Sequence, residues 1–179
     1  MRWRWWIYVL IGLCFGIVDW YFLDLLASLG QNQAINDQLN QASGILRLLV
    51  VIVLVGLNYG IWLVPVIPAA IYEMRRSQSL KQAALAAAIV WAAAMVSYYG
   101  YYTILLMFAG LPQMEFMLYS NHLSPDYWTN WWPSFRNVIL GQFLMWVLIA
   151  LIAGPIVGLI SAAIYRRIDL KRGLQKASA

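Results

Sequence analysis

Four long apolar stretches limit what this chain can fold into more than any other feature. They cover about residues 5–29, 45–72, 83–110 and 138–165. A helix needs about 20 apolar residues to cross the hydrocarbon core of a bilayer, and every stretch is longer than that. Hydrophobic residues make up 63% of the chain and charged residues 11%, which is more apolar surface than one water-soluble core of this size can bury. We therefore predict an all-α integral membrane protein, a four-helix bundle of two helical hairpins forming one transmembrane domain over residues 1–179.

The basic residues indicate how this bundle lies in the membrane. Ten of the 12 Lys and Arg residues lie before the first stretch, between the second and third, or after the fourth, where residues 166–179 form a basic tail. Because cytoplasmic loops carry the excess of Lys and Arg, we expect a multi-pass protein of the cell (inner) membrane with both termini in the cytoplasm. Asp19 and Asp24 interrupt the first stretch, so we expect it to remain as a span and not to be removed as a signal peptide.

The segment between the third and fourth stretches, residues 111–137, is too aromatic for a solvated loop. It contains seven Phe, Tyr and Trp residues, which suit the headgroup zone of a membrane. Ser124, Pro125 and Asp126 provide a helix cap, a proline at the first helical position and an acid in the first turn. We therefore predict a short interfacial helical segment on the outer face, between the third and fourth membrane helices.

Small residues indicate where the helices pack. Helices in lipid associate through close backbone approach and polar contacts, and three of the four stretches contain a GxxxG motif. The motifs leave open whether the partner helix belongs to the same chain or to another copy. The second stretch carries glycines on one side and Asn58 on the other, so we expect it in the centre of the bundle, and we expect kinks near Pro65, Pro68 and Pro155. The predicted packing residues are Gly12, Gly16, Gly56, Gly60, Gly154 and Gly158.

Asp19 is the sharpest candidate for chemistry, because an acid within the hydrocarbon region is costly and is by default a hypothesis of function. It shares the packing stripe of Gly12 and Gly16, so it should face protein. Two interpretations stay open: a proton or cation site, or a structural acid that meets polar groups of neighbouring helices. Asp24 lies nearer the outer surface, where we expect a structural ion pair with Arg47 or Arg136.

Four tyrosines lie around Gly100 in the third stretch. They surround the helix, so they cannot all face the headgroups, and at least two should point inward. We predict a pocket open to the outer leaflet that holds a lipid-like or small amphipathic ligand; the alternative is ordinary aromatic packing and anchoring. The predicted ligand-binding residues are Asp19, Asp24, Asn58, Tyr59, Tyr98, Tyr99, Tyr101 and Tyr102.

The sequence offers little for catalysis. His122 is the single histidine and Cys14 the single cysteine, so this chain alone cannot build a bis-histidine haem site or an internal disulfide. No nucleotide-binding, metalloprotease or nucleophile-elbow motif is present. Glu115, His122 and Asp126 have irregular spacing for a metal site in the outer loop. We expect no cofactor, no metal and no nucleic-acid partner, and we favour a protein that is not an enzyme.

The two halves of the chain share a short sequence. Residues 69–72 and 162–165 both read Ala-Ala-Ile-Tyr, and two arginines follow each of them within four residues. Either a duplication or the convergence of membrane-exit sequences explains this likeness. We expect a subunit or homo-oligomer that works in transport or membrane-complex assembly, with membrane lipids and another membrane protein as partners. The alternatives are a proton- or cation-coupled small transporter that uses Asp19, and an outer-face enzyme that modifies lipids.

Overall fold

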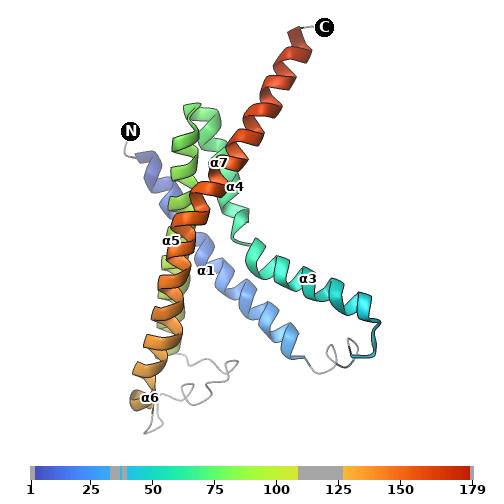
Figure 1. Ribbon diagram of the computed structural model, residues 1–179. Coiled ribbons are helices and arrows are strands. Elements are labelled where there is room, and N and C mark those ends of the chain that lie inside the picture. Colours follow the sequence, from blue (N-terminus) through green and yellow to red (C-terminus); the bar gives the residue numbers. More distant parts are fainter. Residues whose placement is uncertain (1–2, 33–36, 38–39, 109–126, 178–179) are drawn as a thin grey trace.

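The computed structural model describes residues 3–32, 37, 40–108 and 127–177, and the regular structure within them is entirely helical (Figure 1). This confirms the predicted all-helical class. The capping sequence predicted at residues 124–126 lies outside the described residues. The elements are α1 (Trp3–Gln31), α3 (Gly44–Gly60), α4 (Leu63–Ser77), α5 (Leu80–Phe108), α6 (Tyr127–Ser134), the π-helical turn η2 (Phe135–Leu140) and α7 (Gly141–Ala177).

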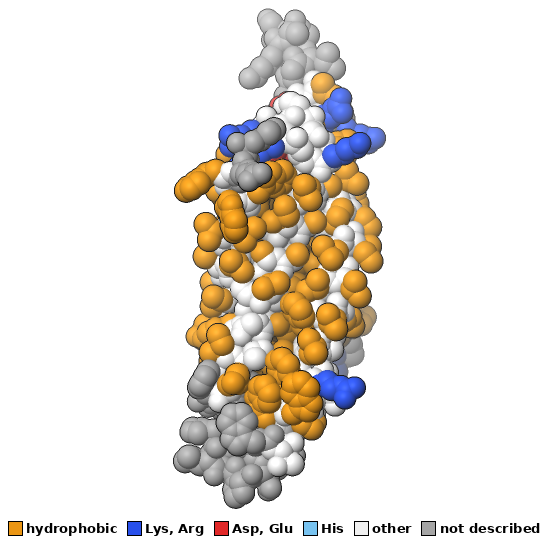
Figure 2. Space-filling view, turned by 90° about the vertical axis from the view of Figure 1, so that its left-hand side faces the viewer, with side chains coloured by type: hydrophobic (Ala, Val, Ile, Leu, Met, Phe, Trp, Pro, Cys, Tyr) orange, Lys and Arg blue, Asp and Glu red, His pale blue; other side chains and the backbone are white. Residues whose placement is uncertain are grey.

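Three helical segments of the described chain are long and apolar enough to cross a membrane, which indicates a membrane protein. They are 3–29, 80–105 and 131–170; α3 and α4, bent by 51° at a short break, make a fourth if they form one span. Both termini and the α4–α5 link lie at one end of the molecule, where most of the Lys and Arg side chains in view also gather (Figures 1 and 2). We call this end the basic end and the opposite one the loop end.

Helix α5 is the centre of the structure, because α1, α4 and α7 all pack against it. Glycines make the close approaches. A Cβ atom added at Gly16 would collide with the backbone of α5 at Ala94, and one added at Gly158 would lie 2.9 Å from Ala84 Cα. Gly12 and Gly154 lie against α5 in the same way. The sequence analysis placed the second stretch at the centre, and the structure corrects this to the third.

Helix α3, the first part of the second stretch, stands apart from the bundle (Figure 1). It has no buried residue, and nothing lies within 4 Å of a Cβ atom added at Gly56 or Gly60. These two glycines therefore do not pack against any residue that the structure describes. The break after α3 has a local cause: Pro65 has no N–H to donate to the carbonyl of Ile61, and its ring clashes there. The N–H of Val64 donates to that carbonyl instead, at 3.0 Å.

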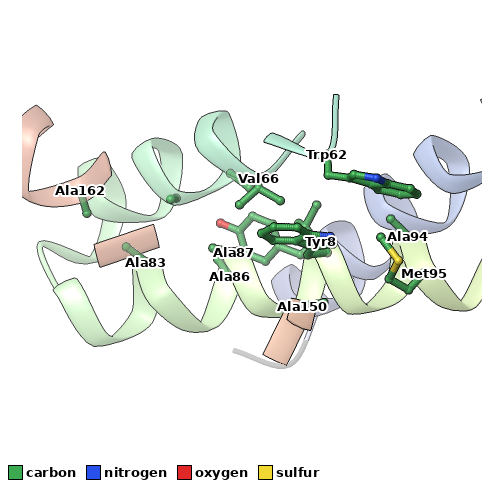
Figure 3. Close-up of a cluster of buried hydrophobic side chains, with 14 of the residues drawn as sticks. Tyr8, Trp62, Val66, Ala83, Ala86, Ala87, Ala94, Met95, Ala150 and Ala162 are labelled. Atoms are coloured by element: carbon green, nitrogen blue, oxygen red, sulfur yellow. The ribbon is translucent and has the colours of Figure 1, made fainter. Parts of the chain in front are cut away.

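Beyond the break, α4 is well packed. Trp62, Val66 and Tyr8 of α1 gather over the alanines of α5, and together they form the main apolar core (Figure 3). The alanines keep α5 thin on this side, so α4 can approach it closely. Because α4 is firmly packed and α3 is exposed, the break separates a packed helix from an unpacked one.

Of the predicted interfacial segment between the third and fourth membrane helices, the structure describes residues 127–137, which are helical but do not form a separate element. α6 leads into η2, and η2 leads into α7 without a gap in the chain. The predicted basic tail is also helical, because α7 continues to Ala177. The two halves of the chain pack unequally: α5 and α7 contact each other extensively, whereas α1 and α4 contact only slightly. The shared sequence therefore does not produce equivalent hairpins.

Candidate functional site

A buried polar network ties three helices together at the basic end. Glu73 of α4 is 0% exposed; its Oε1 lies 3.3 Å from the Arg4 guanidinium, and its Oε2 accepts a hydrogen bond of 2.6 Å from the Tyr8 hydroxyl. Arg4 also donates to Gln82 of α5 at 2.8 Å. A buried carboxylate that accepts a charge-assisted hydrogen bond and also forms an ion pair makes strong polar contacts. The network joins α1, α4 and α5 where the chain carries most of its positive charge.

The sequence analysis missed this network. It assigned Arg4 to membrane topology and gave Glu73 no role. One signal was available: Glu73 is the single acid in the basic link between the second and third stretches. An acid among arginines at a helix end often has a specific partner, but the partner here is 69 residues away in the sequence.

Asp19 lies in the α1–α5 interface, as predicted. It is 1% exposed, and neither carboxyl oxygen has a hydrogen-bond partner. Ser97 of α5, whose hydroxyl lies against Gly16, donates to the carbonyl of Ala94 at 3.1 Å. The single salt bridge among the described residues is the one between Arg4 and Glu73. Asp19 is therefore a buried acid without a countercharge from the described part of the chain.

The structure does not bring the eight predicted ligand-binding residues into one pocket. Asn58 and Tyr59 are exposed on α3, and Tyr59 stacks on Trp146 of α7 with ring centroids 5.8 Å apart. The Tyr101 hydroxyl hydrogen-bonds with Tyr21 of α1. The remaining tyrosines of the cluster have different surroundings. Tyr98 packs on Trp62 and Tyr99 packs on Phe143. Tyr102 is buried.

The predicted ion pair of Asp24 is also absent. Within the described residues, Asp24 forms no salt bridge with Arg47 or Arg136. Arg47 donates to the backbone carbonyl of Asn40, which precedes α3, and Arg136 lies in η2, which packs against α7, α6 and α5. The separation of α3 from the bundle explains this result, because it places Arg47 at the start of an unpacked helix.

A different pocket opens at the loop end, between α5, η2 and α7. It is an open groove of about 220 Å³ with a mostly apolar lining. Gly100 forms its recess, since nothing lies within 4 Å of a Cβ atom added there. Two lining residues carry a hydroxyl: that of Thr103 donates to the Tyr99 carbonyl at 2.8 Å, and the other is the Tyr99 phenol. The lining residues are Val96, Tyr99, Gly100, Thr103, Phe135, Ile139, Leu140 and Phe143.

The groove depends on the π-helical turn. A π turn widens a helix locally and is found frequently at functional sites, and η2 contributes Phe135, Ile139 and Leu140 to one wall. Phe135 in turn stacks on Trp131 with centroids 5.0 Å apart, so aromatic rings form the end of the groove. The sequence analysis predicted an aromatic pocket on the third stretch, and of its residues only Tyr99 lines this groove.

The described residues contain no cluster of three or more His, Cys, Asp or Glu side chains that could hold a metal ion. Glu115, His122 and Asp126, the considered metal or catalytic set, lie outside the described residues. Comparisons with protein-family models, curated proteins and solved structures each gave no significant match. The groove, the Asp19 carboxyl and the Glu73 network are therefore interpreted from their own geometry.

Proposed function

We propose that this protein is a non-enzymatic, multi-pass membrane protein that holds one hydrocarbon chain of a lipid-like ligand in the groove between α5, η2 and α7. It works as a subunit or homo-oligomer in transport or membrane-complex assembly. The excess of basic residues at the basic end supports a four-span arrangement in the cell (inner) membrane, with this end in the cytoplasm. The groove then opens to the outer leaflet.

The single observation that carries this proposal is the groove itself. Its 220 Å³ is below the roughly 300–1,000 Å³ typical of sites for whole small molecules. Its lining is mostly apolar; the Thr103 hydroxyl already bonds to backbone, and the Tyr99 phenol is the other hydroxyl among the lining residues. A segment of an acyl or isoprenoid chain fits this size and chemistry, and its polar head would lie beside the aromatic residues at the loop end.

Filling the recess tests the proposal. The side chain of Gly100→Leu would occupy the groove without a clash, because a Cβ atom there meets open space. We expect purified wild-type protein in mild detergent to retain a lipid-like molecule by native mass spectrometry, and Gly100→Leu to lose most of it.

Gly44→Leu at the start of α3 is the matched control, since it makes the same change at another open position, away from the groove and outside the GxxxG motif. It should retain as much ligand as the wild type. Wild-type protein that carries no ligand, or equal retention by both variants, would contradict the proposal.

A second candidate, a proton- or cation-coupled small transporter, is favoured by one observation: the burial of Asp19 with both oxygens unpartnered. Membrane-embedded acids mark ion pathways. In proteoliposomes, an imposed pH gradient should drive uptake of the substrate by wild-type protein and not by Asp19→Asn. Substrate flux that ignores the gradient would argue against coupling through this acid.

A further inference from the structure

We propose that the Asp19 carboxyl is the binding site of an exchangeable proton, closed off from the basic end of the molecule by a layer of aromatic rings. The inference deepens the transporter candidate by naming the coupled ion. It also stands without transport, because proton binding is measurable in a protein that moves nothing.

First, the groups around Asp19 leave its charge unbalanced. Asp19 is 1% exposed and both of its oxygens lack a partner. The neighbouring groups do not supply a positive charge. On α5 the facing side chains are Ser97, whose hydroxyl is used by backbone, and the phenol Tyr98. On its own helix the charged residue nearest in sequence is Asp24, five residues later and itself an acid. Among the residues that the structure describes, no cation is placed to neutralise Asp19, so in this proposal a bound proton does so.

The charged groups of α4 are too distant to take this role. Glu73 is paired with Arg4 and meets α1 at Tyr8. Tyr8 precedes Asp19 by 11 residues, which is about 16 Å along a helix. The ion pair at the basic end therefore neutralises itself and leaves Asp19 alone.

Space is the second step. At Gly16, less than one turn from Asp19, α1 lies so close to α5 that even a Cβ atom would collide with the Ala94 carbonyl and the Ser97 hydroxyl. At the level of Gly16 a hydrated or organic cation has no room between these backbones. A proton needs none, and the step is simply –COO⁻ plus H⁺ giving –COOH, with no other reactant.

Access is the third step. On the side of Asp19 that faces the basic end, three rings from three helical segments pack edge to face. Phe15 of α1 lies 6.1 Å from Trp62 at the start of α4, and Trp62 lies 5.5 Å from Tyr98 of α5, measured between ring centroids. Trp62 is buried, whereas α3 before it has no buried residue. The ring layer therefore separates Asp19 from the basic end, and protons reach it from the loop end.

Infrared spectroscopy of the protein in lipid nanodiscs detects directly whether this carboxyl is protonated. The chain has five aspartates and two glutamates, and isotopic labelling of the aspartate carboxyl carbons separates the two kinds. At neutral pH we expect a labelled C=O stretch of a protonated acid that shifts in D₂O. It should persist in Asp24→Asn, the matched control on the same helix, and disappear in Asp19→Asn.

A variant with Asn at the other four aspartates keeps the test valid if Asp19→Asn fails to fold, because Asp19 is then the sole labelled acid. Replacing Trp62 with Ala should open the ring layer and speed the exchange with D₂O. The proposal is overturned if wild-type protein shows no protonated aspartate at neutral pH, if the band never exchanges, or if a carboxylate band responds instead to replacing Na⁺ and K⁺ with choline.

Discussion

The two ends of the bundle are held together in different ways. At the basic end, alanines and glycines bring α1, α4 and α7 into close contact with α5, and a buried ion pair and hydrogen bond connect α1 to α4. At the loop end, large aromatic side chains occupy the interfaces, α3 stands away from the bundle, and a groove opens beside α5 (Figure 1).

This difference shows what sets helix packing in a membrane. Lipid tails are as apolar as the helix surfaces, so exclusion from solvent does not press helices together. Helices in a membrane approach each other closely only where small residues leave room or where polar groups form contacts between them. At the basic end, the alanines within residues 83–88 of α5 and the glycines that face them allow this close approach. The large tyrosine side chains within residues 98–102 occupy the interfaces further along, and a groove opens there beside α5.

Removing the buried acid should have the largest effect on stability. Glu73→Ala leaves the Arg4 charge without its partner inside the basic end, and breaking a buried pair in this way costs about 3–5 kcal/mol. Arg4 is 15% exposed, so we expect a loss near the lower figure. Reversible unfolding in mixed micelles with a denaturing detergent measures it.

Two further variants distinguish the loss of the ion pair from a general effect of substituting a helical residue. Glu73→Ala combined with Arg4→Ala should recover part of the loss, because no uncompensated charge remains. Asp169→Ala on the exposed part of α7 should change stability little. If Glu73→Ala unfolds at the wild-type detergent concentration, the basic end is not held by this network.

The next effect concerns close packing. Gly158→Ala places a methyl group 2.7 Å from the Ala87 side chain and 2.9 Å from Ala84 Cα, so α7 must shift away from α5. Overpacking of this kind costs about 1–3 kcal/mol. Gly100→Ala makes the same change on α5 in open space at the loop end and should preserve stability. Equal losses in the same unfolding assay would show that the two ends do not differ in packing density.

The sequence predicted the helices well because their cause is local. The four apolar stretches correspond to α1, to α3 with α4, to α5, and to α7 with η2, and the boundaries on the N-terminal side agree within about three residues. The kink predicted near Pro65 is present as the break one turn before it. Asp19 was also placed correctly in a protein interface, because it shares a helix face with Gly12 and Gly16.

Partners were not predictable because they are chosen by distant residues. Asn58 and Tyr59 looked as suitable for a pocket as Tyr99, yet the break at Trp62 turns α3 away and leaves only Tyr99 in the groove. Glu73 and Arg4 carry no local sign that they belong together. A π turn such as η2 has no residue signature comparable to a proline kink, so the groove that it shapes was not visible in the sequence.

The smallest effect on stability is expected on α3. Gly56→Leu adds a large side chain to a helix without buried residues, where nothing lies within 4 Å of the new Cβ atom. The free energy of unfolding should therefore change by less than about 1 kcal/mol, the range of helix propensity alone. If another helix binds α3 through its GxxxG face, as the proposed subunit or homo-oligomer does, the same variant should lower the mass of the complex measured by light scattering in mild detergent. A loss of stability comparable to that of Gly158→Ala would mean that α3 packs within its own chain in the membrane, and the contrast between the two ends would then not hold for α3.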